Sequence, residues 1–303
     1  MKDIERYRHL NEYLKEKFGE RTLKICVDGG FTCPNRDGKC GYGGCIYCSE
    51  KGSGELINAK PSITEQVKHY FTTYRAERAN KFIVYFQNFT NTYDTIENLK
   101  KKYDSALIDE RIIGISIGTR PDCINEEVVK LLKTYADKYY VCVELGLQTS
   151  NEEIGKVINR GYTNKDFTEA VKLLNKYEID VVTHIMVGLP NETKEDVMNT
   201  VKFINKHELQ GVKIHCTYVV ENTVLAEMYK KGEYNALELD YYIETLVDII
   251  TNLKPTFVIH RITGDAPKNI LVAPKWNVHK MWIIHGFEKR LSGRNLWQGK
   301  YYE

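Results

Sequence analysis

Six runs of apolar and β-branched residues recur along the chain, and a stretch with helical periodicity follows each of them. The runs occupy residues 23–27, 82–86, 112–118, 139–146, 180–188 and 211–219. Several are almost continuously apolar, which is typical of parallel strands buried on both faces. Strands that alternate with helices predict right-handed βαβ units, and therefore an α/β fold with a parallel sheet. Periodicity leaves two architectures open, a doubly wound open sheet and a partial TIM-type barrel.

Several of the intervening helices begin at recognisable capping residues. Asn151 precedes an apolar-periodic stretch, and Thr163 and Thr193 each have an aspartate three residues further on. A threonine with an acidic residue at that spacing is typical of a capping box. We therefore expect helices to begin directly after these three positions.

The character of the sequence changes after Asn235. A helical pattern covers about residues 237–253, and a segment rich in tryptophan, lysine and arginine ends the chain. We predict a core in residues 1–235, which includes an N-terminal helix, and a small extension in residues 236–303. The extension is expected to close over the core and not to form an independent domain.

The composition indicates an ordinary globular protein. Its 303 residues are 42% hydrophobic and 28% charged, and a formal net charge of +2 gives no strong attraction to nucleic acid or membrane. Residues 1–20 are charged throughout, and no apolar run reaches the roughly 20 residues that span a bilayer. We expect no secretory signal, no membrane partner and a cytoplasmic location, where thiols stay reduced.

Five of the eight cysteines fall between positions 26 and 48, in and before a glycine-rich loop that follows the first predicted strand. Cys45 and Cys48 form a CxxC pair. A structural zinc site commonly uses two such pairs, and only one is present. A thioredoxin-like pair would open a helix, whereas glycines and a proline surround this one. The third alternative is an iron–sulfur cluster held by three thiolates, with one iron left open for a ligand.

Nine motifs between Gly30 and Pro267 carry a resemblance to a known family. They read GFTCPNRDG, GGCIYC, YFQNFTNTY, GTRPDC, ELGLQT, INRGYT, HIMVGLPNET, GVKIH and RITGDAP. In these motifs the chain resembles radical S-adenosylmethionine (SAM) enzymes, specifically the bacterial YhcC/YtqA-type family. That family is related to the radical domain of the Elongator catalytic subunit and, more distantly, to oxygen-independent coproporphyrinogen oxidases. The resemblance implies a partial (β/α)6 TIM-type barrel, a 4Fe–4S cluster and SAM.

The resemblance also implies roles for the cysteines. Cys33, Cys45 and Cys48 match the cluster ligands, with a gap after Cys33 that is wider than in many radical SAM enzymes. Cys40 matches no motif position and is expected to be a bystander. The other cysteines are expected to be packed thiols: Cys26, Cys123, Cys142 and Cys216.

Polar residues at strand ends are expected to bind SAM. The resemblance implies that Tyr47 meets the adenine and that Arg160 holds the SAM carboxylate in a bidentate pair. Glu144 lies within an apolar strand and needs a polar partner, which the resemblance identifies as SAM, and Gln148 would assist it. Gly188 is expected to shape the loop on the adenine side.

A second group of polar residues follows or lies within the strands. These residues are expected to line the SAM or substrate pocket: Gln87, Thr90, Asn91, Thr119 and Arg120. His184 and His215 stand at alternating strand positions, and we expect them to be satisfied core histidines.

The cofactor that the resemblance implies defines a chemistry. Reductive cleavage of SAM gives a 5′-deoxyadenosyl radical that abstracts hydrogen from carbon, with an electron from a low-potential donor such as flavodoxin or ferredoxin. Kinship with Elongator-type enzymes implies transfer RNA (tRNA) as the substrate, recognised at the wobble uridine of its anticodon loop. The specific hypothesis is conversion of 5-carboxymethylaminomethyluridine to 5-aminomethyluridine.

The end of the chain offers a candidate surface for that RNA. Cations and aromatic residues are mixed in it: Trp276, Lys280, Trp282, Lys289, Arg290, Arg294, Trp297 and Lys300. Cations suit phosphates, and aromatic rings suit splayed bases. The alternative is a helix with a basic outer face and an aromatic inner face.

Two other functions stay open. Within enzymes, a radical SAM protein of this kind could act on a small metabolite or a tetrapyrrole. From a different class, a zinc-stabilised RNA-binding module without catalysis would use the same cysteines to hold a metal ion.

Overall fold

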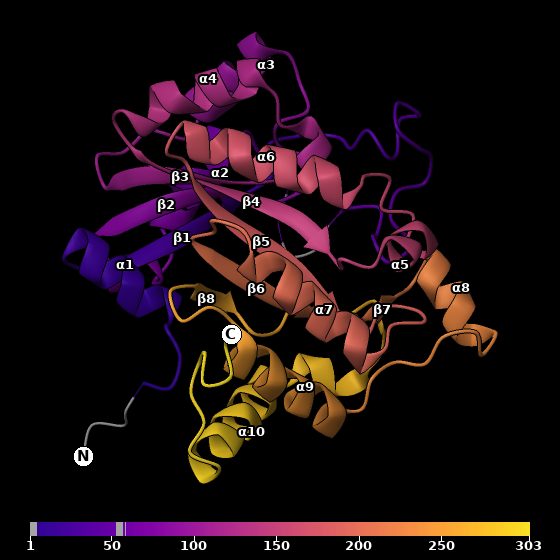
Figure 1. Cartoon of the computed structure of the whole chain (residues 1–303). Helices are drawn as coiled ribbons and strands as arrows, with labels where there is room; N and C mark the ends of the chain where they lie inside the picture. The colour runs from indigo at the N-terminus through magenta and orange to yellow at the C-terminus, as the bar shows by residue number, and fades with distance from the viewer. Residues whose placement is uncertain (1–4, 53–56, 58) are drawn as a thin grey trace.

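The computed structural model describes residues 5–52, 57 and 59–303, and it contains a parallel sheet with helices packed against it (Figure 1). All six predicted strands are confirmed. The strands are β1 (Thr22–Val27), β2 (Lys81–Phe86), β3 (Ile112–Thr119), β4 (Tyr140–Gln148), β5 (Asp180–Val187), β6 (Gly211–Cys216), β7 (Val219–Val220), β8 (Val258–Arg261) and β9 (Leu271–Ala273). The α-helices are α1 (Leu10–Phe18), α2 (Ile63–Phe71), α3 (Ile96–Asp104), α4 (Glu126–Ala136), α5 (Glu152–Val157), α6 (Asn164–Lys176), α7 (Lys194–Asn205), α8 (Val224–Lys230), α9 (Leu239–Asn252) and α10 (Lys280–Gly293).

The main sheet is parallel throughout, and its strands follow one another in chain order. The order is β1-β2-β3-β4-β5-β6-β8. A doubly wound sheet would reverse its order at a switch point, whereas successive right-handed crossovers in one direction place the helices on one face. The partial TIM-type barrel is therefore confirmed. β8 is a seventh strand of this sheet, and it is formed by residues of the predicted extension.

The sheet curls strongly enough for its inner side chains to meet across the interior. The Nζ atom of Lys24 on β1 lies 2.6 Å from Oε1 of Glu144 on β4. Three strand spacings of about 4.8 Å would separate β1 from β4 by about 14 Å in a flat sheet. The contact therefore defines an inner face that encloses a space.

The N-terminal segment covers the edge of the barrel at β8. The N–H of Ile259 on β8 donates to the carbonyl of Arg8 at 2.8 Å, and His9 pairs with Ile259 in an isolated parallel bridge. Helix α1 then packs against both β8 and β1. Covering an edge strand in this way satisfies backbone groups that would otherwise be open to another chain.

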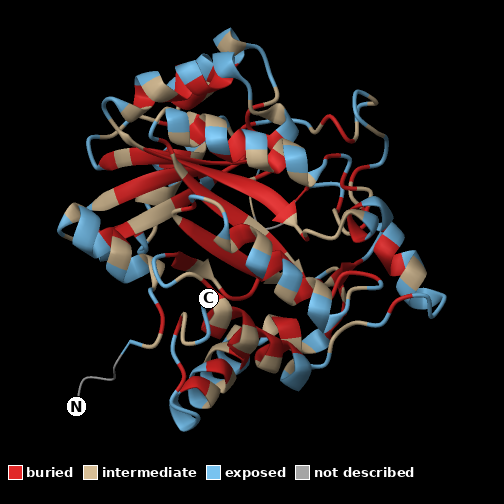
Figure 2. Cartoon of the chain, viewed as in Figure 1, coloured by how far each residue is buried: buried red, intermediate tan, exposed pale blue. Residues whose placement is uncertain are grey.

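The predicted helix starts are confirmed. The side chains of Thr163 and Thr193 accept from the N–H groups of Asp166 and Asp196, and both complete capping boxes. Asn151 caps α5. The helices bury an apolar stripe against the outer face of the sheet, as the red bands along α6 and the central strands show (Figure 2).

The extension is built into the core. Besides β8, its strand β9 pairs antiparallel with β7, and α9 packs against α7 and α10. Arg290 donates to Glu244 and Asp240 at 2.7 Å each, and Arg294 donates to Glu244 with both terminal nitrogens. Figure 1 shows α9 and α10 as a separate layer beside the barrel. These arginines thus have partners within the protein.

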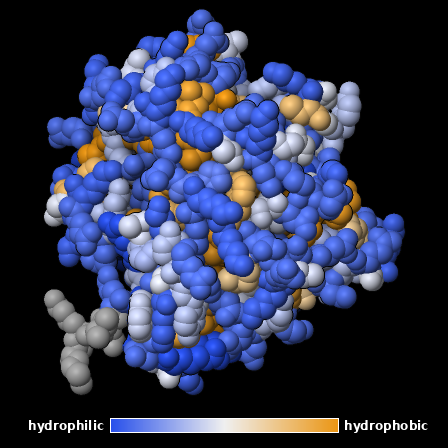
Figure 3. Space-filling model, viewed as in Figure 1, coloured by the Kyte–Doolittle hydropathy of each residue, from blue (hydrophilic) through white to orange (hydrophobic). Residues whose placement is uncertain are grey.

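Hydrophilic side chains predominate on the face of the molecule drawn in Figure 3, and apolar ones are scattered among them. Among the described residues, no helix combines the length and the apolar character needed to cross a membrane.

Candidate active site

A cavity of about 970 Å³ occupies the barrel interior and its mouth. Residues of the cysteine loop line it together with inner-face residues of β1 to β6 and β8. Because parallel strands end at the same edge, the loop after β1 meets the polar residues that end β3 and β4. The cavity is therefore the place where the sequence motifs converge.

Three of the loop cysteines line this cavity, namely Cys33, Cys45 and Cys48. Cys40 does not line it; its thiol is exposed and lies 3.7 Å from a carboxylate oxygen of Asp122. The geometry thus separates the expected cluster ligands from the expected bystander.

The cysteine loop is held in place by neighbouring backbone. The N–H of Cys48 donates to the carbonyl of Cys45 at 2.9 Å, which closes the CxxC turn, and the N–H of Ile46 donates to Ile158 at 3.1 Å. The Nδ2 group of Asn159 donates to the carbonyl of Gly44 at 2.8 Å. These bonds fix the loop against the connection between α5 and α6.

Three thiols that line one cavity are the donor set of a four-iron cluster that keeps one iron open. A four-iron cluster takes one thiolate per iron, so its cysteines lie farther apart than the ligands of one ion. Within residues 5–52, 57 and 59–303, no group of three or more His, Cys, Asp or Glu side chains is placed to hold a single metal ion. Burial raises the pKa of Cys45, and burial with the neighbouring Cys45 raises the pKa of Cys48 to about 12. Binding to metal would supply the positive charge that stabilises these thiolates.

The four remaining cysteines differ in their surroundings. Cys142 and Cys216 are buried, as predicted. Cys123 lines a second cavity beside Thr92 and Asp94. The prediction for Cys26 is wrong, because its side chain is open to the main cavity on the inner face of β1.

Four of the residues expected to bind SAM or to line its pocket do line the cavity: Tyr47, Gln87, Thr119 and Gln148. The Tyr47 side chain hydrogen-bonds the Cys45 thiol, and burial raises the pKa of Tyr47 well above its ordinary value. Gln148 ends β4 with a positive φ of 69°. This left-handed conformation turns the chain sharply at the mouth of the barrel.

Of the other polar residues expected to line the SAM or substrate pocket, two do so and one does not. Thr90 and Arg120 line the cavity. Asn91 does not; its Nδ2 group donates to the carbonyls of Phe86 at 3.1 Å and Gly118 at 2.7 Å, so it joins the ends of two strands.

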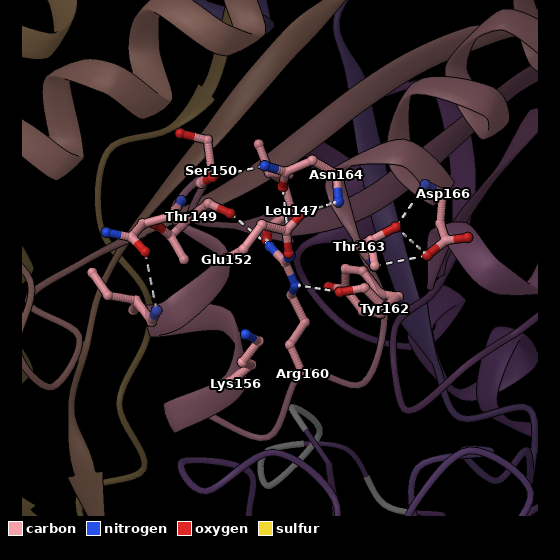
Figure 4. Close-up of polar contacts among 12 residues, drawn as sticks. Leu147, Thr149, Ser150, Glu152, Lys156, Arg160, Tyr162, Thr163, Asn164 and Asp166 are labelled. Atoms are coloured by element: carbon pink, nitrogen blue, oxygen red, sulfur yellow. Dashed lines mark hydrogen bonds and ion pairs between the residues drawn. The ribbon is translucent and has the colours of Figure 1, made fainter.

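Arg160 requires a correction, because it lies outside the cavity lining and its guanidinium is fully buried. Figure 4 shows the guanidinium directed at neighbouring backbone and side chains. Its five N–H groups donate to Leu147, Thr149, Glu152, Tyr162 and Asn164 at 2.6–3.4 Å. No N–H group is left for the SAM carboxylate, so Arg160 instead ties the end of β4 to α5 and α6.

Gly188 also lies outside the cavity lining. Its φ of 88° and a Cβ position only 2.6 Å from the Leu237 side chain explain the need for glycine. The N–H donates to Glu192 at 2.7 Å, and the carbonyl accepts from Tyr234 at 2.7 Å. Gly188 therefore shapes the turn after β5, against the segment that precedes α9, and the expectation that this loop lies on the adenine side stays a prediction.

Glu144 lies on the inner face, but its partners are protein groups. One oxygen accepts from Lys24 at 2.6 Å and from Ser116 at 2.7 Å. The other contacts Lys213 and the Nε2 atom of His184, the latter at 2.9 Å. Cationic neighbours hold the pKa of Glu144 well below its usual range in spite of complete burial. The polar partners that a buried Glu144 needs are thus present within the protein, in a cluster with Lys24, Ser116, His184 and Lys213 that we call the barrel floor. Its predicted contact with SAM stays a prediction.

The histidines are partly as expected. His184 is satisfied by Glu144, and both His184 and His215 line the cavity. Burial lowers the pKa of each, so both are neutral near pH 7.

Sequence reasoning missed two lysines of this cluster. Lys24 and Lys213 each interrupt an apolar strand run, LKICV and GVKIH, which is the same signal that identified Glu144. A charge within such a run needs a buried partner. Applied to Lys24, Glu144 and Lys213, that rule predicts a buried partner for each residue, although not that the three meet.

Two family models match the chain. Residues 35–204 match the Radical SAM superfamily, and residues 209–292 match the Radical_SAM C-terminal domain. The first match begins two residues after Cys33 and includes both cysteines of the CxxC pair.

Relatives of known sequence point the same way. The uncharacterized protein YtqA of Bacillus subtilis is 38% identical over 300 residues, which cover 98% of this chain and 93% of YtqA. A tRNA uridine(34) acetyltransferase of Methanocaldococcus jannaschii is 32% identical over 183 residues, which cover 59% of this chain and 32% of the acetyltransferase. This second likeness therefore concerns a part of each protein.

The fold is also that of a solved structure. Elp3 of the archaeon Methanocaldococcus infernus superimposes with a TM-score of 0.67 at 20% identity, over 91% of this chain and 64% of Elp3. At that identity the likeness concerns the fold. The family models and the likeness to YtqA show that the chain belongs to the radical SAM superfamily, as an enzyme of the Elongator-related YhcC/YtqA type whose family cofactors are a 4Fe–4S cluster and SAM.

Proposed function

We propose that this radical SAM enzyme modifies the wobble uridine of tRNA. The observation that carries the proposal is that three loop cysteines and the polar strand ends line one and the same cavity. The partial likeness to a tRNA uridine(34) acetyltransferase supports this choice of substrate. A cytoplasmic location, where tRNA is found, is part of the same proposal.

Each cofactor has candidate contacts in the cavity. Cys33, Cys45 and Cys48 would hold the cluster and leave one iron open. Tyr47, which hydrogen-bonds Cys45, and Gln148 line the same cavity and would contact SAM. Gln87 and Thr119 also line it and are further candidates: the Thr119 hydroxyl lies 2.6 Å from the hydroxyl of Thr92, a contact that restrains its rotamer. A positioned rotamer of this kind suits precise placement of the cofactor.

The proposed reaction converts 5-carboxymethylaminomethyluridine to 5-aminomethyluridine. With an electron from a donor such as flavodoxin or ferredoxin, the bound cluster supplies the reductive cleavage of SAM that yields methionine and a hydrogen-abstracting 5′-deoxyadenosyl radical. The C–H bond that breaks lies beside the substrate carboxylate. Loss of one electron and the N–H proton then forms a C=N bond, and water cleaves it into the amine and glyoxylate. The substrate radical gives up one electron, and the cleavage of SAM consumes one electron. The two balance, so SAM is the net oxidant.

The RNA surface of the proposal differs from the one that the sequence indicated. Arg290 and Arg294 have partners in α9, and Trp276 stacks on Tyr242 with 5.5 Å between ring centroids. Trp282, by contrast, is 56% exposed and stacks on His279 at the start of α10. This stacked pair lies next in sequence to Lys280, which contacts Asp265 at the cavity lining. An exposed aromatic ring near the cavity suits a splayed base.

Nucleoside mass spectrometry of tRNA from a strain without the gene tests the proposal. The strain should accumulate 5-carboxymethylaminomethyluridine at the expense of aminomethyl derivatives, and a plasmid copy of the gene should restore them. An unchanged nucleoside profile, in an organism with no other route to the product, would favour the small-metabolite function instead.

A further inference from the structure

The floor of the barrel carries more positive than negative charge. Lys24 on β1 and Lys213 on β6 both approach the Glu144 carboxylate, one at each oxygen. Both ammonium groups also lie over the Tyr85 ring, at 5.1 Å and 4.2 Å from its centroid. Two ammonium groups and one carboxylate leave one positive charge in excess. The neighbouring His184 is neutral near pH 7 because burial lowers its pKa.

The next cation along the floor does not alter this balance. Arg261 on β8 and Lys280 share the carboxylate of Asp265, at 3.0 Å and 3.2 Å, so this group offers no negative charge that could neutralise the two lysines. The excess therefore belongs to the pair of lysines. A buried charge without a counter-ion is costly, and one carboxylate suffices to compensate one ammonium group.

Both lysines keep donors that can serve a ligand. A lysine has three N–H groups. Among the described contacts, Lys24 donates to Glu144 and, at 3.4 Å, to Ser116, and Lys213 donates to Glu144. Both side chains line the cavity and are not packed against apolar residues alone. If the cluster only stabilised the fold, one lysine would suffice to pair with Glu144. The lysines would also not need to line a cavity.

The geometry also shows that one carboxylate fits between the two ammonium groups, because Glu144 already occupies such a position. The two oxygens of a single carboxylate contact Lys24 and Lys213 from the side of β4. A second small oxyanion could approach the same nitrogens from the cavity. The excess charge would then be neutralised.

We propose that Lys24 and Lys213 bind an anionic oxygen group of the substrate on the barrel floor. Glu144 acts as a positioning residue that holds both ammonium groups toward the cavity. The proposal rests on the proposed function only for the identity of the anion, which in that reaction is the carboxylate next to the reacting carbon. A nucleotide phosphate has the same chemistry and is the second source that the experiment distinguishes.

Small anions test the site without tRNA. N-methylglycine, its amide and inorganic phosphate are titrated into the full-length reconstituted protein, and binding is followed by calorimetry or NMR saturation transfer. N-methylglycine should bind at least tenfold more tightly than the amide. Lys24→Met and Lys213→Met should each lower this affinity at least tenfold. Glu144 keeps one lysine partner in each variant, so both proteins should fold, and circular dichroism checks that they do.

Two control variants sharpen the result. Lys100→Met removes an outer-surface lysine paired with Asp104 and should bind N-methylglycine as wild type does. Lys213→Arg keeps the charge and should retain affinity within about threefold. If phosphate binds more tightly than N-methylglycine and depends on the same lysines, the anion is a phosphate.

Three outcomes would overturn the proposal: no binding of either anion to wild type, equal binding to wild type and Lys213→Met, or competition between N-methylglycine and SAM. Competition would mean that the lysines serve the SAM carboxylate. An unchanged tRNA profile in the deletion strain, with anion binding intact, would count against the proposed function alone.

Discussion

The side-chain amide of Asn35 donates a hydrogen bond of 2.6 Å to the main-chain carbonyl of Asn159. Asn35 belongs to the cysteine loop, and Asn159 follows α5, so this bond joins segments that are far apart in sequence. The same amide lies 3.9 Å from the Cys45 sulfur. A loop anchored in this way presents its thiols to the cavity.

The cysteines that line the cavity should each be needed for the cluster. Replacement of Cys33, Cys45 or Cys48 by alanine removes one of three thiolates, so the reconstituted variants should lose most of their iron and sulfide. Cys40→Ala is the matched control and should reconstitute as wild type does, because its thiol lies outside the cavity. Iron and sulfide assays with absorption spectra give the answer. Loss of the cluster in Cys40→Ala, with retention in Cys33→Ala, would reverse the assignment.

Arg160 should matter for stability and not for SAM affinity. Arg160→Met removes one donor from each of three buried carbonyls, of which that of Leu147 keeps the Thr149 N–H, and this should lower the free energy of unfolding by about 2–4 kcal/mol. Denaturant unfolding measures this change, and equilibrium dialysis of the folded variant should give a SAM affinity within about twofold of wild type. Lys156→Ala, an exposed change on the adjacent helix, should alter neither. A stable Arg160→Met protein that fails to bind SAM would restore the original assignment.

Glu192 should make stability depend on pH. Burial raises its pKa to about 8, although the N–H groups of Gly188 and Leu189 donate to it. Because the folded protein holds this proton more tightly than the unfolded chain, stability is lost as the pH rises from about 5 toward 8. Glu192→Gln cannot carry a negative charge at this position. The free energy of unfolding of the variant should therefore exceed that of wild type by a margin that grows over this pH range, to about 1–3 kcal/mol at pH 8.

Melting temperatures at pH 5, 6.5 and 8 test this difference for Glu192→Gln. Glu195→Gln is the matched control, because Glu195 is exposed on the first turn of α7 and should show no such trend. A constant difference between Glu192→Gln and wild type across the range would contradict the prediction.

Anion binding on the barrel floor should weaken in alkaline solution. Burial lowers the pKa of Lys213 to about 8, so its positive charge is lost as the pH rises through that value. The groups that face it are Lys24, Tyr85, Glu144, His184, His215 and Arg261. Both histidines are neutral above pH 7, so Lys213 should dominate the change. The affinity for N-methylglycine should fall several-fold between pH 7 and pH 9, and a flat profile would speak against Lys213 as a ligand.

Much of the barrel could be predicted from the sequence, because strand and helix periodicity and capping residues are local signals. β8 was missed as a strand of the barrel since its short run, Val258–Arg261, follows a helix in what reads as an appendage. The cysteine loop was recognisable because thiols at fixed spacings are rare. Arg160 was misread because a motif gives a residue's position and not the direction of its side chain. The lysine pair depends on the curl of the sheet, which brings β1 and β6 to β4 and has no local signature.

Turnover of defined tRNA by the purified enzyme tests the central claim most directly. The anaerobically reduced, reconstituted protein is incubated with SAM and tRNA that carries 5-carboxymethylaminomethyluridine, and nucleosides, 5′-deoxyadenosine and glyoxylate are quantified by mass spectrometry. The account predicts that 5-aminomethyluridine appears together with equimolar glyoxylate and at least as much 5′-deoxyadenosine. SAM cleavage that leaves the modified uridine intact would contradict it.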